Sequence, residues 1–260
     1  MPEFESFDGL VLHYEEDGPA PADGQVPVVL LHGFAASYEG NFVAPGISAA
    51  LVAAGRHIIG LDARGHGLSS KPYESSAYEG DAMARDVIAL FDHLGLSSAD
   101  VVGYSMGAGN AMRFAQLDSR VRRLVLGGIG DDIGGPVTPE ATEKWNRRRQ
   151  RIADAMLEQM NESTTDMARR FVRFAESTKA DMQALGASQR ARVNRPMGAG
   201  AAEVKVPTLV VCGDKDFEPH TLASRLPDGR AVVVSGDHLS AVGDPALARA
   251  IVDFLADEMS

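Results

Sequence analysis

The sequence predicts an α/β fold in which a mostly parallel sheet is covered by helices on both faces. Short apolar runs without polar alternation, such as 26–31 and 208–212, are typical of strands buried on both faces. Segments with apolar residues at helical spacing, such as 77–94, separate these runs. When strands and helices alternate in this way, right-handed crossovers make neighbouring strands parallel and place helices on both sides of the sheet.

The first residues favour an antiparallel hairpin. The segments 4–7 and 10–14 are separated by Asp8-Gly9, a dipeptide typical of a tight hairpin turn. We expect these two strands at an edge of the sheet.

The remaining elements alternate along the chain. Gly55 and Gly95 are expected to end two helices, because glycine readily adopts the left-handed conformation that closes a helix. The predicted strands are 26–31, 57–61, 101–104, 121–126, 206–212 and 231–235, and the predicted helices are 44–54, 77–94, 106–115, 219–225 and 245–259.

Residues 138–202 interrupt this alternation. Three helical patterns follow one another there, at 139–160, 163–177 and 180–193. An all-helical insertion in an α/β chain is expected to be a cap. We therefore predict a core domain of residues 1–137 and 203–260, with a helical cap of residues 138–202 inserted after the sixth strand.

The cap sequence carries an apolar face and basic runs. The apolar side chains fall near one face of each helix and are expected to pack on the core: Trp145, Ile152, Met156, Met160, Met167, Phe171 and Phe174. Contact with the substrate is the alternative, and both can hold for a cap over a pocket. The basic residues in 147–151 and 169–170 are expected to form a solvated face. A clamp for a phosphate or carboxylate substrate is the alternative.

The composition excludes several classes of partner. The chain has 36 acidic and 25 basic residues and a net charge of -11, which disfavours nucleic acid and anionic membrane surfaces as partners. The N-terminal segment lacks an apolar signal region, and no apolar run approaches membrane-spanning length, so we expect a cytoplasmic protein. The single cysteine, Cys212, excludes an internal disulfide and a Cys-x-x-Cys zinc site. We expect it to be a buried structural thiol.

The central motif is Gly103-Tyr104-Ser105-Met106-Gly107. It lies between a predicted strand and a predicted helix, which is the setting of a nucleophile elbow. Small residues at Gly103 and Gly107 would let the strand and the helix approach closely. The start of the helix would then offer the Met106 backbone N–H to a developing oxyanion.

A serine hydroxyl needs a base, and the base needs an orienting carboxylate. His238 follows the last predicted strand and Asp216 follows the strand before it, so both should emerge at the same sheet edge as Ser105. The order Ser105, Asp216, His238 favours these three as a triad. His220 remains a rival base and Asp214 a rival acid.

Five motifs carry a resemblance to a known family. They are His32-Gly33-Phe34, Asp62-x-Arg64-Gly65-His66-Gly67, Gly103 to Gly107, Gly213-x-x-Asp216-x-x-Pro219 and Gly236-x-His238. The chain resembles the α/β-hydrolase fold family, specifically the small capped branch of esterases, lactonases, cofactor-free haloperoxidases and carbon–carbon bond hydrolases. The resemblance implies an eight-stranded, mostly parallel sheet.

The resemblance also implies roles for single residues. The backbone N–H groups of Phe34 and Met106 would form the oxyanion hole, and His32, Asp62, Arg64 and His66 would be structural. Asp131 or Asp132 could serve as a displaced acid, as in some relatives. Dehalogenases and epoxide hydrolases of this fold use aspartate at the elbow, where this chain has Ser105.

We therefore expect a serine hydrolase that cleaves a small, largely apolar ester or lactone through an acyl-enzyme. Its partner would be a small-molecule substrate, with no metal and no cofactor, and no G-x-G-x-x-G dinucleotide motif occurs. Within enzymes, the alternatives are carbon–carbon bond hydrolysis and perhydrolysis by the same triad. Outside enzymes, the alternative is a ligand-sensing protein with little turnover.

Overall fold

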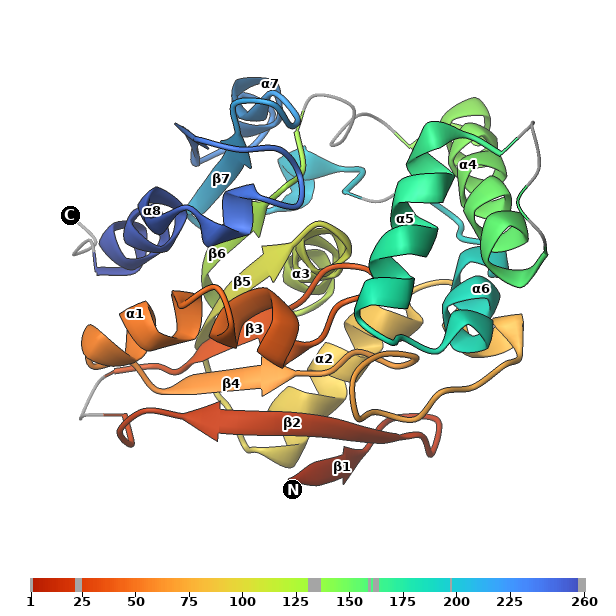
Figure 1. Cartoon of the computed structure of the whole chain (residues 1–260). Coiled ribbons are helices and arrows are strands. Elements are labelled where there is room, and N and C mark those ends of the chain that lie inside the picture. The colour runs from red at the N-terminus through yellow and green to blue at the C-terminus, as the bar shows by residue number, and fades with distance from the viewer. Residues whose placement is uncertain are drawn as a thin grey trace.

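The computed structural model describes residues 2–21, 25–130, 137–158, 160, 164–196 and 198–256. Eight strands form one sheet in the order β1-β2-β4-β3-β5-β6-β7-β8 (Figure 1). The strands from β4 to β8 in this order pair parallel, whereas β1 and β2 are antiparallel to their neighbours. The predicted fold class is therefore confirmed. The strands are β1 (Glu3–Glu5), β2 (Val11–Asp17), β3 (Val28–Leu31), β4 (Ile58–Leu61), β5 (Ala99–Tyr104), β6 (Val121–Gly127), β7 (Thr208–Gly213) and β8 (Gly229–Val234).

The N-terminal hairpin forms as predicted, with Gly9 at a φ of 84° in its turn. Both hairpin strands were expected at an edge of the sheet, but of the two only β1 is an edge strand, because β2 also pairs with β4, placing Tyr14 opposite Leu61. The other edge of the sheet is β8, the last strand of the chain.

Two apolar clusters lie on the two faces of the sheet. On one face, Phe91 of α2 packs against Phe114 of α3 with their ring centroids 4.7 Å apart. On the other face, Leu51 of α1 and Ile251 of α8 join the same buried cluster. Each such buried side chain contributes roughly 1.5–3 kcal/mol to folding. The helices around the sheet are α1 (Ile47–Ala53), α2 (Ala82–His93), α3 (Met106–Leu117), α7 (Pro219–Ala223) and α8 (Pro245–Ala256).

Two of these helices are shorter than the sequence pattern indicated. In the predicted helix 77–94, residues 75–78 form a 3-10 turn and Gly80 has a φ of 60°, so α2 begins only at Ala82. In the predicted helix 44–54, a π-helical turn (Glu39–Val43) and Gly46 at a φ of 86° precede α1. Periodicity of apolar residues does not detect a left-handed glycine, which interrupts the helical backbone.

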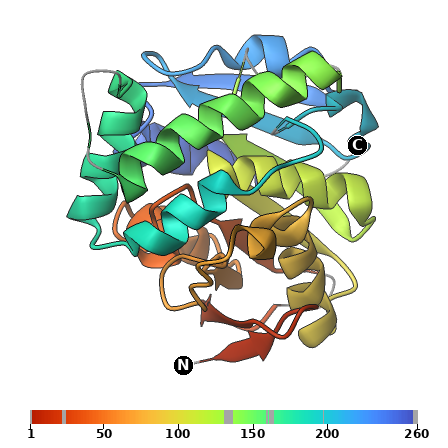
Figure 2. The same ribbon diagram turned by 90° about the vertical axis from the view of Figure 1, so that its right-hand side faces the viewer.

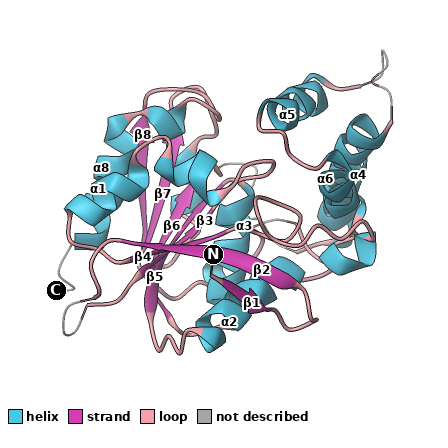
Figure 3. Cartoon of the chain, turned by 60° about the horizontal axis from the view of Figure 1, so that its bottom comes forward, coloured by secondary structure: helices cyan, strands magenta, loops and turns pink. Residues whose placement is uncertain are grey.

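Three further helices follow β6, namely α4 (Pro139–Leu157), α5 (Asp166–Ser177) and α6 (Met182–Arg190). They lie together at one end of the molecule, apart from the helices that flank the sheet (Figures 2 and 3). Each begins at a side-chain cap: Thr138 and Thr165 accept hydrogen bonds from Ala141 and Ala168, and Asp181 caps α6. In the described part of the chain, no helix is long and apolar enough to cross a membrane.

The packing of these helices partly differs from expectation. Ile152 and Met156 are buried as predicted, whereas Met160 and Met167 are exposed. Met160 lies beyond the end of α4, so the helical spacing that aligned it with the apolar face does not reach it. Helix α6 packs closely on α4 because Gly186 has no side chain: a Cβ there would lie 2.3 Å from Cγ of Leu157.

Candidate active site

Ser105 lies in a strained turn between β5 and α3. Its backbone has a φ of 53° and a ψ of -112°, a conformation that costs a non-glycine residue of order 1–3 kcal/mol and persists only where the surroundings enforce it. The Ser105 N–H donates to the Gly127 carbonyl at 2.8 Å. A Cβ at Gly103 would lie 2.3 Å from the Gly107 carbonyl oxygen, and one at Gly107 would lie 1.9 Å from the Leu31 carbonyl oxygen. Glycine is therefore required at both positions, as predicted.

The structure brings the three predicted triad residues together. Nε2 of His238 lies 2.9 Å from Oγ of Ser105, and Nδ1 lies 3.0 and 3.1 Å from the two carboxylate oxygens of Asp216. Because a carboxylate only accepts, this network assigns the proton to Nδ1 and leaves Nε2 to accept from the serine hydroxyl. The His238 side chain is 22% exposed and that of Asp216 only 4%.

The loops after β7 and β8 hold this arrangement. The Tyr104 hydroxyl donates to the backbone carbonyl of His238 at 2.8 Å, and burial raises the pKa of Tyr104, so the hydroxyl keeps its proton at neutral pH. The Gly236 N–H donates to Oδ1 of Asp214 at 2.8 Å. A Cβ at Gly213 would lie 2.1 Å from the Gly236 carbonyl oxygen, so the two loops are in close backbone contact.

The rival residues have other roles or lie elsewhere. Asp214 braces the His238 loop by accepting a hydrogen bond from the Gly236 N–H, and the carboxylate that bonds to the imidazole is that of Asp216. The His220 side chain is 67% exposed and bonds to Glu218. Asp131 and Asp132 lie outside the described residues.

The predicted oxyanion donors flank Ser105. Met106 is the first residue of α3, and Phe34 follows Gly33, where a Cβ would lie only 3.4 Å from Cβ of Ser105. Within the described residues, neither the Phe34 nor the Met106 N–H donates to a protein acceptor. Both amides are therefore available to an oxygen bound beside Ser105.

Asn41 is a supporting residue that the sequence analysis missed. Its buried side chain accepts a hydrogen bond from the Gly33 N–H at 2.7 Å, which fixes the loop that carries Phe34. No motif marked Asn41. The surrounding sequence, which includes Ser37, Glu39 and Gly40, carried no signal that set Asn41 apart.

The turn at residues 62–67 is structural, as the resemblance implied. Asp62 accepts hydrogen bonds from the Tyr38 and Leu68 amides at 2.9 and 2.8 Å. Arg64 is fully buried and pairs with both carboxylate oxygens of Asp86, at 2.7 and 2.5 Å. These bonds tie the turn to the loop before α1, through Tyr38, and to helix α2, through Asp86.

Two neutral histidines lie behind Phe34. His32 donates from Nδ1 to the Gly33 carbonyl and accepts from the Ala63 amide at Nε2, and burial lowers its pKa. Burial also lowers the pKa of His66 to about 3. Nε2 of His66 is buried without a partner in the described structure, and its ring contacts Phe34 edge to face. Neither histidine contacts Ser105, so both support the loop rather than the chemistry.

A cavity of about 420 Å³ opens over Ser105. The sheet side contributes Phe34, Ser105, Met106 and His238, and helices α4 and α5 contribute Trp145, Ile152, Phe171 and Phe174. Phe34 meets Phe171 edge to face at 5.4 Å, so the predicted apolar face of α5 lies directly over the loop after β3. Phe217 and Leu239, which the sequence analysis did not single out, also line the cavity. Among the described residues, no cluster of His, Cys, Asp or Glu is arranged to hold a metal ion.

Cys212 is a buried structural thiol, as predicted. It donates to the Ile129 carbonyl, and burial raises its pKa to about 12.

Comparison with known proteins identifies the family. A family model described as alpha/beta hydrolase fold matches residues 26–175. The chain is 38% identical over 110 residues to epoxide hydrolase B of Mycobacterium tuberculosis, covering 42% of this chain and 30% of that protein. It is 30% identical over 242 residues to 2-hydroxy-6-oxononadienedioate/2-hydroxy-6-oxononatrienedioate hydrolase 2 of Pseudomonas putida, covering 85% and 80%.

The solved structures agree on the fold. The enol-lactonase from Burkholderia xenovorans LB400 superposes with a TM-score of 0.71 at 25% identity and covers 98% of this chain and 100% of that one. The match to epoxide hydrolase B spans less than a third of that protein, so it concerns only part of its length. The chain therefore belongs to the alpha/beta hydrolase fold family.

Proposed function

We propose that this protein is a serine hydrolase that cleaves a small, largely apolar carboxylic ester or lactone through an acyl-enzyme. One observation carries the proposal: Oγ of Ser105, in a strained turn, lies 2.9 Å from an imidazole whose other nitrogen faces a buried carboxylate. A carboxylate in this position holds the base in the tautomer that can accept the serine proton. Serine at the elbow is the reason that we do not propose epoxide hydrolysis, despite the partial match to epoxide hydrolase B.

In the proposed mechanism, Oγ of Ser105 attacks the substrate carbonyl carbon while Nε2 of His238 takes the hydroxyl proton. Asp216 stabilises the imidazolium that forms. The tetrahedral intermediate collapses as His238 gives this proton to the leaving alkoxide, and an acyl-enzyme remains. A water then gives a proton to Nε2 and attacks the acyl carbon, which forms a second tetrahedral intermediate. This intermediate collapses as His238 returns the proton to Oγ of Ser105, and the acid is released.

The Phe34 and Met106 amides would bind the oxyanion of both tetrahedral intermediates. Their N–H groups donate to no acceptor in the described protein, so they need no reorganisation at the moment of reaction. One such donor is worth about 2.7–4 kcal/mol of transition-state stabilisation in acyl-transfer sites. The Asn41 contact to Gly33 would keep the Phe34 amide in position.

Residues 138–202 would act as the cap that selects the substrate. The aromatic and aliphatic side chains of α4 and α5 form one wall of the 420 Å³ cavity, and Ser105 and His238 lie on the opposite wall. An apolar wall of this kind favours substrates with an alkyl or aryl chain beside the carbonyl.

Hydrolysis of a carbon–carbon bond is the second candidate. One relative, which is 30% identical and matches 85% of this chain, is named 2-hydroxy-6-oxononadienedioate/2-hydroxy-6-oxononatrienedioate hydrolase 2. The same triad and oxyanion donors could act on such a ketone. Measuring turnover of simple esters and of a 2-hydroxy-6-oxo dienoate separates the two candidate functions. Efficient turnover of the esters alone would support ester hydrolysis, and efficient turnover of the dienoate alone would support carbon–carbon bond hydrolysis.

A fluorophosphonate probe tests whether the protein is an enzyme at all. We expect stoichiometric labelling, located on Ser105 by peptide mass spectrometry, and no labelling of Ser105→Ala. Absence of labelling in folded wild-type protein would refute the proposal and favour a ligand-sensing role.

A further inference from the structure

Arg149 is a partly buried cation, and no counter-ion pairs with it in the described structure. It lies on α4, and one guanidinium nitrogen donates to the Ser188 carbonyl of α6. Its Nε atom is buried without a hydrogen-bond partner. Burial lowers the pKa of Arg149 to about 10, and no neighbouring carboxylate raises it again. The guanidinium therefore stays charged at neutral pH while one of its donors remains unused.

The expectation that residues 147–151 form a solvated face is wrong for Arg149. Arg147, two residues earlier on the same helix, is 61% exposed and pairs with Glu143. Arg148 stacks on the Trp145 ring and donates to the sulfur of Met167. The sequence pattern could not separate these arginines, because the packing of α6 on α4 decides which one is covered.

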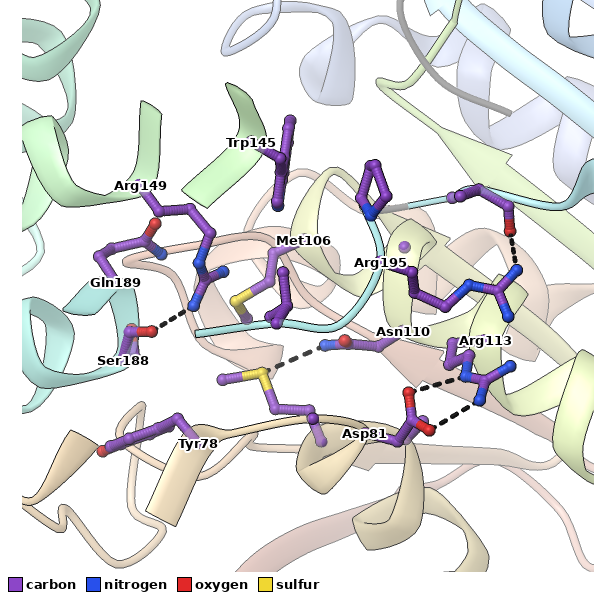
Figure 4. A pocket seen from close by; sticks show the side chains of 18 of the residues that line it. Tyr78, Asp81, Met106, Asn110, Arg113, Trp145, Arg149, Ser188, Gln189 and Arg195 are labelled. Carbon is purple, nitrogen blue, oxygen red and sulfur yellow. Dashed lines mark hydrogen bonds and ion pairs between the residues drawn. The ribbon is translucent and has the colours of Figure 1, made fainter. Parts of the chain in front are cut away.

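Arg149 lies where two cavities meet. The 420 Å³ cavity over Ser105 and a second cavity of about 100 Å³ are both lined by Met106, Trp145, Arg149 and Gln189 (Figure 4). Gln189 comes from α6 and is largely buried. An anionic group held at this junction would lie in the same cavity as the Ser105 hydroxyl.

Arg113 and Gln116, which also line the smaller cavity, are engaged by protein partners. Arg113 pairs with both carboxylate oxygens of Asp81 at 2.7 Å, as Figure 4 shows. The Gln116 amide donates to the Ala199 and Gly200 carbonyls at 3.0 Å. Arg170, on the rim of the larger cavity, pairs with Asp237 at 3.2 Å. In the described part of this site, Arg149 is thus a partly buried cation whose charge is not matched, whereas Lys215, which also lines the larger cavity, is exposed.

We propose that Arg149 binds a carboxylate of the substrate, remote from the carbonyl that Ser105 attacks. The proposal rests on the hydrolase function above and narrows its substrate class to half-esters, or lactones and ketones that bear a free carboxylate. A guanidinium fork matches a planar carboxylate in two hydrogen bonds, and a buried charge is stable only when it is paired. The apolar wall of Ile152, Phe171 and Phe174 would contact the carbon chain between the two polar ends.

Matched ester pairs test the proposal by catalysis. The 4-nitrophenyl monoesters of adipate and pimelate are compared with 4-nitrophenyl hexanoate and heptanoate, in which a methyl group replaces the carboxylate. We expect the wild-type protein to show a higher kcat/KM for the charged member of a pair. In Arg149→Gln this charged-to-neutral ratio should fall about 10- to 100-fold, the range typical of hydrogen bonds to a charged group. Arg149→Lys should lose part of the preference for the charged ester, because the lysine ammonium cannot form the two parallel hydrogen bonds that a guanidinium makes to a carboxylate.

Arg147→Gln is the matched control. It removes the same charge from the same helix at an exposed position, so the ratio should stay at the wild-type value. A ratio that falls equally in both variants would mean that general electrostatic attraction, and not a subsite at Arg149, sets the preference. Equal turnover of charged and neutral esters by the wild type, unchanged in Arg149→Gln, would overturn the proposal directly.

A binding measurement separates this proposal from the hydrolase function. Calorimetric titration of Ser105→Ala with monomethyl adipate should give binding that is weakened about 10-fold or more by adding Arg149→Gln, with methyl hexanoate as the neutral comparison. Circular dichroism checks that each variant is folded. Arginine-dependent binding without any ester turnover would support the subsite while refuting the hydrolase. Tighter binding of a phosphonate analogue than of the carboxylate would overturn the assignment to carboxylates.

Discussion

Replacing Asp216 by asparagine tests the electrostatic design of the triad. Both carboxylate oxygens of Asp216 face Nδ1 of His238, at 3.0 and 3.1 Å, so the native side chain can only accept from this nitrogen. An amide can turn its NH₂ group toward Nδ1, which then becomes the acceptor and moves the imidazole proton to Nε2. In that tautomer His238 cannot take the proton of Ser105. We expect kcat for 4-nitrophenyl butyrate to fall about 10⁴-fold, equivalent to roughly 5.5 kcal/mol of activation free energy.

Asp214→Asn is the control for this change. Asp214 lies two residues away and accepts a hydrogen bond from the Gly236 N–H, a role that an amide oxygen can also fill. We expect its kcat to remain within about threefold of wild type, by analogy with surface substitutions that keep their hydrogen bonds. If Asp216→Asn keeps more than about a tenth of the wild-type activity, the orienting role of Asp216 is wrong. In that case, a large loss of kcat in Asp131→Asn or in Asp132→Asn would identify that residue as a displaced acid.

Three further changes follow from the packing and the buried charges. Gly107→Ala should destabilise the fold by roughly 3 kcal/mol or more in urea unfolding, because its Cβ would meet the Leu31 carbonyl, whereas Gly243→Ala, in open space, should be nearly neutral. The folded state holds His66 neutral with a pKa of about 3, so the unfolded state takes up the proton first and the free energy of unfolding should fall as the pH drops below 6.5. That loss should reach about 2 kcal/mol at pH 5 and be smaller in His66→Gln. Phe171→Ala removes the edge-to-face contact with Phe34, and should raise KM for hexanoate esters more than for acetate esters.

Each of these has a clear contrary result. A normal urea midpoint for Gly107→Ala would mean that β3 and α3 can separate without cost. An unchanged slope of stability against pH in His66→Gln would show that His66 is not the group being protonated. Equal KM changes for short and long acyl chains in Phe171→Ala would place the acyl chain elsewhere in the cavity.

The chain order of Ser105, Asp216 and His238 was sufficient to predict their convergence. Parallel strands present their carboxyl ends at one edge of the sheet, so residues that follow β5, β7 and β8 must emerge together. The glycines at 103 and 107 could be predicted for the same kind of reason, because a strand and a helix that meet in a tight turn leave no room for a Cβ. The convergence of the three side chains and the need for the two glycines follow from strand topology and from steric limits, and both can be inferred from the sequence pattern.

Other features depend on packing between distant segments, and the sequence pattern does not record that. Arg149 belongs to the same basic run as the exposed Arg147, and it is partly covered only because α6 packs against α4. Asn41 supports the Phe34 loop through a contact across eight residues that no periodicity predicts. The late start of α2 similarly follows from the left-handed Gly80, which a count of apolar positions does not detect.

Because His238 follows the edge strand β8, the proposed catalytic activity depends on this edge of the sheet staying folded. His238 follows this strand, which has a neighbour on only one side and several partly exposed side chains, whereas Ser105 follows the central strand β5. Peripheral strands open at lower free energy than central ones, so β8 should separate transiently while the rest of the sheet stays intact. On heating or on addition of denaturant, catalytic activity should therefore be lost before circular dichroism detects global unfolding. The loss of turnover would then measure the local opening of β8.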